Sequence, residues 1–392
     1  MSPEQLARSQ DLKRLRDEGY EVHVRDGYVF LTHVPYLTGA REVKLGILVS
    51  PLTLAGDVTG PPADHVVMFA GEQPCHQDGR PLTEIINGPH QQALFDDVVV
   101  EYRLSSKPEG GYRDYYEKLS AYANMLSGPA QAIDETATAR TYQVIEDRAE
   151  ESVFRYIDTA TSRAGIGLVT QKLAIASVAI VGLGGTGSYI LDLVAKTPVR
   201  EIHLFDGDRF LQHNAFRSPG APSIDELQGA PRKVDYFAQR YGRMRRGIVP
   251  HGQLDESNVS LLEGMSFVFV AVDRGVARKL AVDSLVEAGV PFVDVGMGVH
   301  EVDGALMGQL RSTLGTKEVS AHLATRLPFT EHGDDDYSQN IQIADLNALN
   351  ATLAVIKWKK LLGFYVDLEG EHSIVYQIDG NHLVNEDKRA AD

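Results

Sequence analysis

The stretch Val178-Ala-Ile-Val-Gly-Leu-Gly-Gly-Thr-Gly-Ser188 decides the fold of this chain. Its first four residues are apolar and predict a buried strand, and the residues from Thr186 to Lys196 predict a helix, so the glycines form the turn between them. Glycine permits a tight turn and lets backbone N–H groups approach a phosphate, while the helix N-terminus favours negative charge. The stretch therefore predicts a nucleotide-binding loop built from Gly182, Gly184, Gly185, Thr186 and Gly187.

Strands and helices alternate from this loop onward. The expected elements, in chain order, are a strand at Glu201–Phe205, a helix at Arg232–Arg243, a strand at Ser266–Val272, a helix at Val276–Ala288 and a strand at Pro291–Val295. Apolar strands separated by helices indicate a parallel sheet covered on both faces. We expect an α/β fold with a doubly wound, Rossmann-like sheet, followed by a long helix at Ile343–Leu362 and a last strand at Ser373–Ile378.

The first part of the chain has a different texture. A charged helix is expected at Pro3–Glu18, and alternating segments such as Tyr20–Thr32 and Glu42–Ser50 are typical of strands in a half-exposed sheet. A later strand leads into a helix at Tyr112–Leu126. The polar segment Ser127–Arg140 is the best boundary, so we predict an α+β accessory domain over residues 1–140 and the nucleotide-binding domain over residues 141–392.

Composition excludes several classes of protein. The chain has 392 residues, of which 43% are apolar, with 38 Lys and Arg against 54 Asp and Glu, for a formal charge of −16. This acidic balance argues against a nucleic-acid or anionic-membrane binder. The longest apolar stretch, Leu173 to Leu183, is too short to span a bilayer, and no signal segment opens the chain. With a single cysteine, Cys75, the chain is expected in the cytoplasm.

Charged residues follow the loop at positions that suit phosphate chemistry. Asp206 ends the next strand, 19 residues after Gly187, where a carboxylate can accept hydrogen bonds from ribose hydroxyls. NAD is the default ligand for such a pattern, but a hydride-transfer cofactor does not need the later charges. Arg217 and Lys233 would neutralise an α-phosphate and a departing pyrophosphate, and Asp273 could hold Mg²⁺.

The order of these elements resembles the ThiF/MoeB/E1 adenylation domain over roughly residues 155–365. The resemblance rests on the glycine loop, Asp206-Gly-Asp208, Asn214, Arg217, Lys233, Ala271-Val-Asp273, and the helix that begins Ile343-Ala-Asp-Leu-Asn. It implies an E1-like enzyme that uses ATP and Mg²⁺ to adenylate the C-terminal carboxylate of a ubiquitin-like or sulfur-carrier-like protein, releasing pyrophosphate. It also implies a homodimer.

The resemblance assigns roles by position. The loop Gly182–Gly187 would cradle phosphates and Asp206 would bind ribose, with Asp208 supporting that site. Asn214, Arg217 and Lys233 would contact the phosphates, and Asp273 would bind magnesium. Arg163 stands where the family has an arginine that reaches the ATP of a partner subunit, with Arg155 as the competitor. Each also has an ordinary structural interpretation, such as a turn cap for Asp208 or a helix cap for Asp273.

Two features of the family are absent from the sequence. Paired Cys-x-x-Cys zinc ligands do not occur, so no structural zinc is expected, and residues 296–340 contain no cysteine for a thioester. The acyl group would then pass directly to a partner, to a crossover hydroxyl activated by His322 or His332, or to Cys75. The candidate hydroxyls are Ser312, Thr313, Thr316, Ser320, Thr325, Thr330 and Ser338.

Cys75 lies in a loop-like stretch beside His76 and Asp78, which we expect to lower the pKa of its thiol. The N-terminal domain is faintly similar to accessory domains of bacterial ubiquitin-like gene clusters. Such a domain would recruit the ubiquitin-like protein or an E2-like conjugating partner; the alternative is a purely structural dimerisation domain. Two other functions stay open at this point: an NAD-dependent oxidoreductase, and a non-catalytic scaffold that holds nucleotide or a ubiquitin-like protein.

Overall fold

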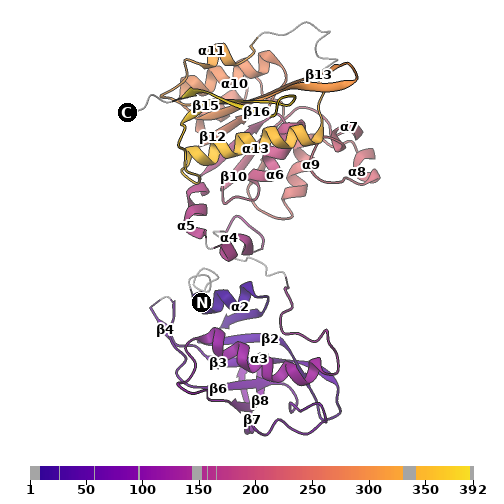
Figure 1. The fold of residues 1–392 in the computed structure, drawn as a ribbon, viewed down its shortest axis with the longest axis vertical. Helices are drawn as coiled ribbons and strands as arrows, with labels where there is room; N and C mark the ends of the chain where they lie inside the picture. Colours follow the sequence, from indigo (N-terminus) through magenta and orange to yellow (C-terminus); the bar gives the residue numbers. More distant parts are fainter. Residues whose placement is uncertain are drawn as a thin grey trace. The chain divides into compact units, whose positions relative to one another are not determined.

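The computed structural model describes residues 9–25, 27–56, 58–95, 98–143, 152–156, 158–164, 166–329 and 341–388. The chain divides into two compact units. The N-terminal unit comprises Met1–Ser152 with Tyr156–Arg163, and the C-terminal unit comprises Val153–Arg155 with Ala164–Asp392. Each unit has its own sheet (Figure 1) and, within it, its own buried apolar core.

The N-terminal unit is an antiparallel sheet with helices packed on one face. Six strands pair in the order β1-β2-β3-β6-β8-β7, and the small β4–β5 hairpin stands apart from them. The strands are β1 (Glu21–Arg25), β2 (Tyr28–Leu37), β3 (Val43–Pro51), β4 (Leu54–Ala55), β5 (Val58–Thr59), β6 (Val66–Ala70), β7 (Ile86–Phe95) and β8 (Val98–Ser105). The helices are α2 (Gln10–Asp17) and α3 (Tyr115–Gln131).

Helix α3 closes the core of the N-terminal unit. Its N-cap, Asp114, accepts a hydrogen bond from the backbone N–H of Glu117, as N-cap carboxylates do. Tyr115 and Tyr122 are fully buried, and each hydroxyl bonds to backbone groups of the sheet side: Tyr115 to Pro51 and Thr53, Tyr122 to His65 and Ser106. Aromatic burial and satisfied hydroxyls together attach the helix to the sheet.

The C-terminal unit confirms the predicted doubly wound α/β fold. Its eight-stranded sheet has the order β11-β10-β9-β12-β13-β14-β15-β16. The pairs from β11 to β13 are parallel, and the pairs from β13 to β16 are antiparallel. The strands are β9 (Ser177–Val181), β10 (Glu201–Phe205), β11 (Ile248–Pro250), β12 (Phe267–Val270), β13 (Phe292–Val302), β14 (Ala305–Gly315), β15 (Glu371–Gln377) and β16 (His382–Lys388).

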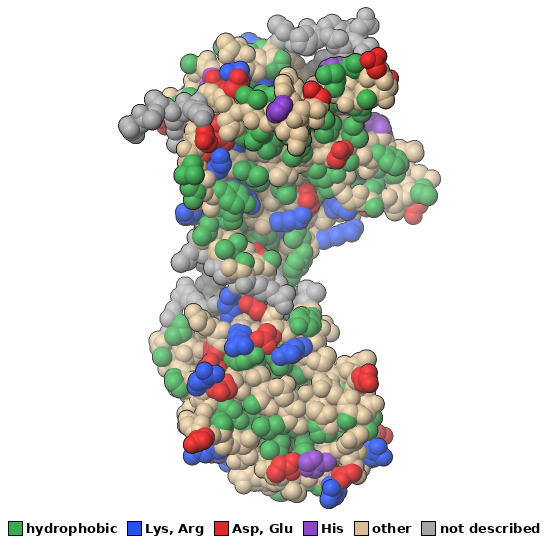
Figure 2. Space-filling model, in the orientation of Figure 1, with side chains coloured by type: hydrophobic (Ala, Val, Ile, Leu, Met, Phe, Trp, Pro, Cys, Tyr) green, Lys and Arg blue, Asp and Glu red, His purple; other side chains and the backbone are tan. Residues whose placement is uncertain are grey.

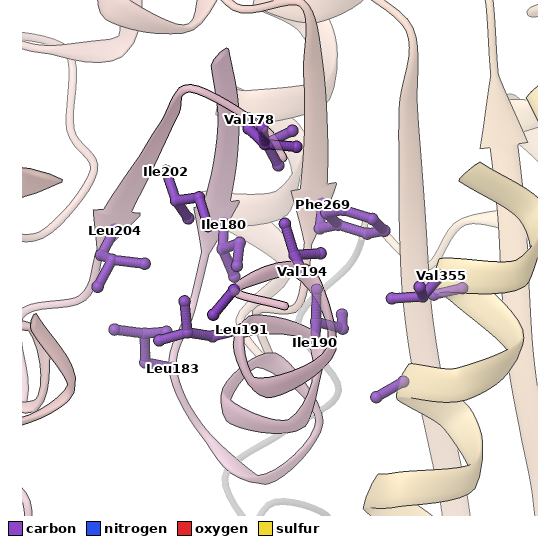
Figure 3. Packing of buried hydrophobic residues seen from close by; sticks show 14 of the residues in the cluster. Val178, Ile180, Leu183, Ile190, Leu191, Val194, Ile202, Leu204, Phe269 and Val355 are labelled. Atoms are coloured by element: carbon purple, nitrogen blue, oxygen red, sulfur yellow. The ribbon is translucent and has the colours of Figure 1, made fainter. Parts of the chain in front are cut away.

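Helices cover both faces of this sheet. One face packs against α6 (Gly185–Val194), α9 (Lys233–Tyr241) and α13 (Ala344–Leu361), and the other against α10 (Gly275–Ala288) and the 3-10 helix η2 (Val259–Gly264). Figure 3 shows Ile180 and Phe269 of the sheet, Leu191 and Val194 of α6, and Val355 of α13 in one cluster. The shorter helices are α4 (Thr159–Ala164), α5 (Gly167–Thr170), η1 (Gln171–Leu173), α7 (Gln212–Ala215), α8 (Ile224–Gln228) and α11 (Leu323–Arg326).

The long β13–β14 hairpin is where the structure goes beyond the sequence prediction. The expected strand stopped at Val295, but β13 continues to Val302 and pairs with β14 along its whole length. The pairing of β12 with β13 ends at Val270 opposite Asp294. The outer half of the hairpin therefore extends past the parallel sheet and forms a wall beside its C-terminal edge.

No described helix is both long and apolar enough to cross a membrane. On the face seen in Figure 2, acidic and basic side chains are interspersed over the surface of each unit.

Trp358 of α13 offers a test of the core. Its side chain is fully buried, and its ring centroid lies 6.2 Å from that of Phe267 and 6.0 Å from that of Phe269. Trp358→Ala should lower the free energy of unfolding by about 3–5 kcal/mol, because it leaves a cavity against the sheet. Leu368→Ala, at a position 90% exposed, should change it by less than about 0.5 kcal/mol. Equal effects in chemical denaturation would contradict this packing.

Candidate active site

The glycine turn lies between β9 and α6, as the sequence predicts. Gly182 has φ +91°, and a Cβ there would lie 2.5 Å from the carbonyl oxygen of Ala271, so only glycine fits. Gly184 is the N-cap of α6, and nothing lies within 4 Å of the place a Cβ would take. The turn is therefore fixed on the sheet side and open on the other.

Helix α13 supports the turn through an asparagine. A Cβ on Gly185 would collide with the side chain of Asn347, and Thr186 Oγ1 donates to Asn347 Oδ1 at 3.0 Å. The Asn347 amide also donates to the carbonyl of Arg217 at 3.5 Å. Asn347 is 1% exposed. It contacts both the glycine turn and the segment that contains Arg217, although the three are far apart in the sequence. The sequence offers Asn347 only as part of the stretch Ile343-Ala-Asp-Leu-Asn, without a role, because its contact with the glycine turn joins segments far apart in the chain.

Asp206 holds the glycine turn against the end of β10. One carboxylate oxygen accepts from the N–H of Leu183 at 2.7 Å, and the other accepts from the N–H of Asp208 at 2.8 Å. The Lys233 ammonium lies 3.5 Å from the same carboxylate. A carboxylate offers about four acceptor sites, so ribose hydroxyls can still donate to it.

Lys233 is the buried cation of the site. It is the first residue of α9, its side chain is 6% exposed, and its Nζ donates to Asp208 Oδ2 at 2.7 Å. Its backbone N–H donates to the carbonyl of Asp208 at 2.9 Å. The hydrogen bond from Lys233 holds the pKa of the Asp208 carboxyl below its ordinary value. Asp208 and Lys233 are thus joined twice, which fixes the loop after β10.

Asn214 belongs to α7 and Arg217 follows that helix, but the two side chains have different surroundings. Arg217 lines the cavity, and its Nε is buried with no hydrogen-bond partner among the described residues. Asn214 is 4% exposed, and its Oδ1 accepts from the backbone N–H of Leu211 at 2.9 Å, closing the first turn of α7. Asn214 is outside the set of residues that line the cavity, so in this structure it shapes the loop that carries Arg217.

Asp273 lies in the segment between β12, which ends at Val270, and α10; it is exposed and on the cavity wall. The N-cap of α10 is Arg274, whose own side chain forms no cap hydrogen bond. The described residues contain no group of three His, Cys, Asp or Glu that could hold a metal ion. A magnesium ion at Asp273 would therefore need further oxygen ligands from a bound phosphate, which magnesium prefers.

Apart from Asn214, these groups meet at one cavity of about 1040 Å³ at the C-terminal edge of the parallel sheet. The nucleotide end, as we name it, is lined by Gly182, Gly184, Gly185, Thr186, Asp206, Asp208, Arg217, Lys233 and Asp273. The hairpin end is lined by Gly296, Gly298, His300, Gln309, Arg311, Asn350 and Gln377. Gly187 instead packs against the carbonyl of Gly182 beneath the turn.

A buried ion cluster stands behind the hairpin end. Asp294 of β13 is fully buried and accepts from Arg278 Nε at 2.9 Å and from Arg311 Nη2 at 2.5 Å. Arg278 also donates to the carbonyls of Val272 and Pro328, so it ties α10 to two loops. Residue patterns did not reveal this cluster, because its members are far apart in the sequence.

The surroundings of Cys75 contradict the prediction that the pKa of its thiol is lowered. The thiol is 2% exposed and donates to the carbonyl of Gln73 at 3.4 Å, and the Cys75 N–H donates to the carbonyl of Leu37. Burial, followed by the negative charge of Asp78, raises the pKa of the thiol, whereas a lowered pKa was expected. His76 faces Glu84 at 3.0 Å. In this conformation Cys75 is a small buried residue.

The structure also shows where several of the candidate hydroxyl acceptors lie relative to the cavity. Ser312 and Thr313 are fully buried in β14, and the cavity-lining residues include none of Thr316, Ser320 and Thr325. His322 Nε2 lies 2.9 Å from the carbonyl oxygen of Leu314. Thr330, His332 and Ser338 lie outside the described residues, as does the side chain of Arg163.

A parallel sheet with a glycine turn, an adjacent acid and a buried lysine on one cavity defines a nucleotide-binding α/β domain. The ThiF family model matches residues 159–356, and the model of a domain of unknown function (DUF6791) matches residues 10–159. The chain therefore belongs to the ThiF family of E1-like adenylyltransferases.

Comparison with solved structures gives matches of low sequence identity. E. coli MccB with ATP is 18% identical with a TM-score of 0.46, and the match covers 59% of this chain and 72% of that chain. PaaA is 15% identical with a TM-score of 0.43, covering 56% and 75%. E. coli MccB with MccA-N7isoASN is 17% identical with a TM-score of 0.45, covering 56% of this chain and 66% of that chain. Among curated proteins, none matches.

Lys233→Ala tests the nucleotide end directly. We expect the affinity for a fluorescent ATP analogue to fall roughly ten- to hundred-fold, because a buried charge-assisted contact to phosphate is lost. The matched control is Lys279→Ala, which removes the same charge from an exposed lysine paired with Asp283. Unchanged affinity in Lys233→Ala, with the melting temperature preserved, would remove Lys233 from the nucleotide site.

Cys75 can be tested by thiol chemistry. The native protein should react with a disulfide reagent such as dithionitrobenzoate at least about ten-fold more slowly than the guanidinium-unfolded chain, because the thiol is buried and its pKa is raised. Similar rates in the two states would show that Cys75 is accessible in the folded protein, and would restore it as a candidate acceptor.

Proposed function

We propose that this protein activates the C-terminal carboxylate of a ubiquitin-like protein by adenylation with ATP, releasing pyrophosphate. A sulfur-carrier-like protein would undergo the same chemistry. One observation carries the proposal: the buried Lys233 and the unpartnered Arg217 Nε stand at one end of a cavity whose other end extends along the β13–β14 hairpin. Such a cavity has room for a nucleotide and for the end of a second substrate.

The residues of the nucleotide end fit ATP. The open space at Gly184 accommodates a phosphate against the N-terminus of α6, and the Arg217 Nε needs an acceptor that phosphate oxygen provides. ATP supplies an electrophilic α-phosphate and a pyrophosphate leaving group. In the reaction, a carboxylate oxygen forms a bond to the α-phosphorus as the bond from that phosphorus to the pyrophosphate oxygen breaks.

The cations would act on the charge that develops in this step. Lys233 and Arg217 lie on the same cavity and would stabilise negative charge on the α-phosphate and on the leaving pyrophosphate. Because Asp208 fixes the Lys233 ammonium at 2.7 Å, the cation is held in place before the substrate arrives. Asp206, held by two backbone N–H groups, would orient the ribose. Asp273 would supply one oxygen ligand to Mg²⁺.

The route of the acyl group after adenylation is a separate part of the proposal. The buried state of Cys75, Ser312 and Thr313 favours direct hand-off of the acyl-adenylate to a partner. We further propose that the protein works in the cytoplasm as a homodimer in which Arg163 reaches the neighbouring site. The N-terminal unit would recruit the ubiquitin-like protein or an E2-like conjugating partner.

The test is ATP–[³²P]pyrophosphate exchange with purified protein and candidate ubiquitin-like partners. Exchange should depend on the partner and on its free C-terminus, and Arg217→Ala should lower it by roughly a hundred- to a thousand-fold, the range for loss of one charge-stabilising donor. Exchange that is absent with every partner, together with tight NADH binding, would favour an oxidoreductase. ATP binding without any exchange would favour a scaffold.

Asp273 makes a distinct prediction through the metal. Asp273→Ala should reduce exchange, and raised Mg²⁺ should partly restore it, because the variant loses one ligand and keeps those on the phosphates. Asp283→Ala, on the exposed side of α10, is the control and should leave the magnesium dependence unchanged. If no concentration of Mg²⁺ improves Asp273→Ala, Asp273 has a role other than holding the metal.

A further inference from the structure

The hairpin end of the cavity is lined by side chains that can donate and accept hydrogen bonds. Gly296 lies opposite Arg311 in the β13–β14 register, and Gly298 lies opposite Gln309, which in turn pairs with Gln377 of β15. Directly opposite residues of an antiparallel pair point to the same face of the sheet. One face of the hairpin therefore presents two bare glycines beside a guanidinium and two amides.

Arg311 is fixed at this face and still has donors to offer. Its Nη2 donates to Asp294, its Nη1 donates to Thr313 Oγ1 at 2.9 Å, and its side chain is 14% exposed. A Cβ on Gly296 would lie 2.8 Å from Arg311 Nη2, so the guanidinium rests directly over that glycine. A guanidinium has five N–H groups. Within the described chain Asp294 and Thr313 accept from two of them, so the others can donate to a ligand.

The charge of the cluster favours an anion. Arg278 and Arg311 share the single carboxylate of Asp294, which is fully buried, so this three-residue cluster carries one net positive charge; Asp379 also lines the cavity. Both arginines line the cavity, but Arg278 already donates to Asp294 and to two backbone carbonyls. Arg311 is therefore the member of the cluster with capacity for a ligand, and Asp294 and Arg278 position it.

Asn350 supplies the complementary acceptor. It is 1% exposed on α13, lines the same cavity, and donates through Nδ2 to the carbonyl of Gly296 at 3.0 Å. Its Oδ1 is buried and has no hydrogen-bond partner in the described part of the chain. Leaving such an oxygen unpaired costs free energy, so the site calls for an N–H donor from a ligand.

We propose that Arg311 and Asn350 form the subsite that binds the terminal peptide unit of the acyl substrate, a flexible peptide end with a free carboxylate. The carboxylate accepts from Arg311, and the last amide N–H donates to Asn350. Gly298, where nothing lies within 4 Å of the place a Cβ would take, leaves room for the main chain, and Gln309 and Gln377 offer further hydrogen bonds. The inference rests on the proposed function for the nature of the substrate, but its binding step needs no ATP.

The experiment uses the full chain and a pair of fluorescein-labelled octapeptides that end in Gly-Gly, one with a free carboxylate and one amidated. Fluorescence anisotropy without ATP should give a dissociation constant about ten-fold lower for the free carboxylate. Arg311→Gln should abolish this difference, and Asn350→Ala should weaken both peptides by roughly ten-fold. Arg326→Gln is the matched control, because Arg326 pairs with Glu386 and Asp387 outside the cavity.

Two further variants test the subsite without removing the charge of Arg311, so that a loss of binding is not simply a loss of folding stability. Arg311→Lys retains the charge beside Asp294 and should keep part of the preference for the carboxylate. Gly296→Ala should displace the guanidinium and reduce the preference without removing any charge. The subsite is overturned if neither peptide binds, or if Arg311→Gln discriminates between them as well as the wild type does.

The outcome also separates this inference from the proposed function. Carboxylate-selective binding through Arg311 without pyrophosphate exchange, for these peptides or for any protein partner, would leave the subsite standing and refute adenylation. Partner-dependent exchange whose KM for the partner is the same in Arg311→Gln and the wild type would refute the subsite and leave adenylation standing. A KM raised in Arg311→Gln, with unchanged affinity for the ATP analogue, supports both.

Discussion

The contact between Lys233 and the two carboxylates of Asp206 and Asp208 is the constraint on which the nucleotide end depends. An ammonium that is 6% exposed is tolerable only if it is paired, and here it lies 2.7 Å from one carboxylate and 3.5 Å from the other. Asp206 at the same time accepts the N–H of Leu183 in the glycine turn. The lysine, the acid after β10 and the turn after β9 are therefore held as one unit.

Under the proposed function, the same arrangement would prepare the site for a polyanion. The exposed carboxylate of Asp208 partly neutralises the lysine in the protein without ligand, and its pKa is held low by the same hydrogen bond. A phosphate that approaches from the cavity competes for a cation that is already oriented, so little reorganisation is needed. The unpartnered Nε of Arg217 adds a second donor from the neighbouring loop.

The parts of the fold that could be predicted from the sequence are those fixed by local patterns. The strand before Gly182, the helix after it and the strand at Glu201–Phe205 follow from continuous apolar residues beside glycines, and the structure confirms them. The full length of β13 could not be predicted, because residues 296–302 are held by pairing with β14 and contain two glycines. Pairing across a hairpin has no equivalent in single-segment periodicity.

The same distinction applies to the site. Asp206 and Lys233 occur at spacings that a sequence can reveal, whereas the direction of the Cys75 pKa depended on burial beside Leu37, which the loop sequence does not show. Asn347 and Asn350 stand three residues apart, and that spacing places both on one face of α13. One contacts the glycine turn and the other the carbonyl of Gly296. A single helix face thus reaches both ends of the cavity, which gives the fold a physical means of aligning a nucleotide with a second substrate.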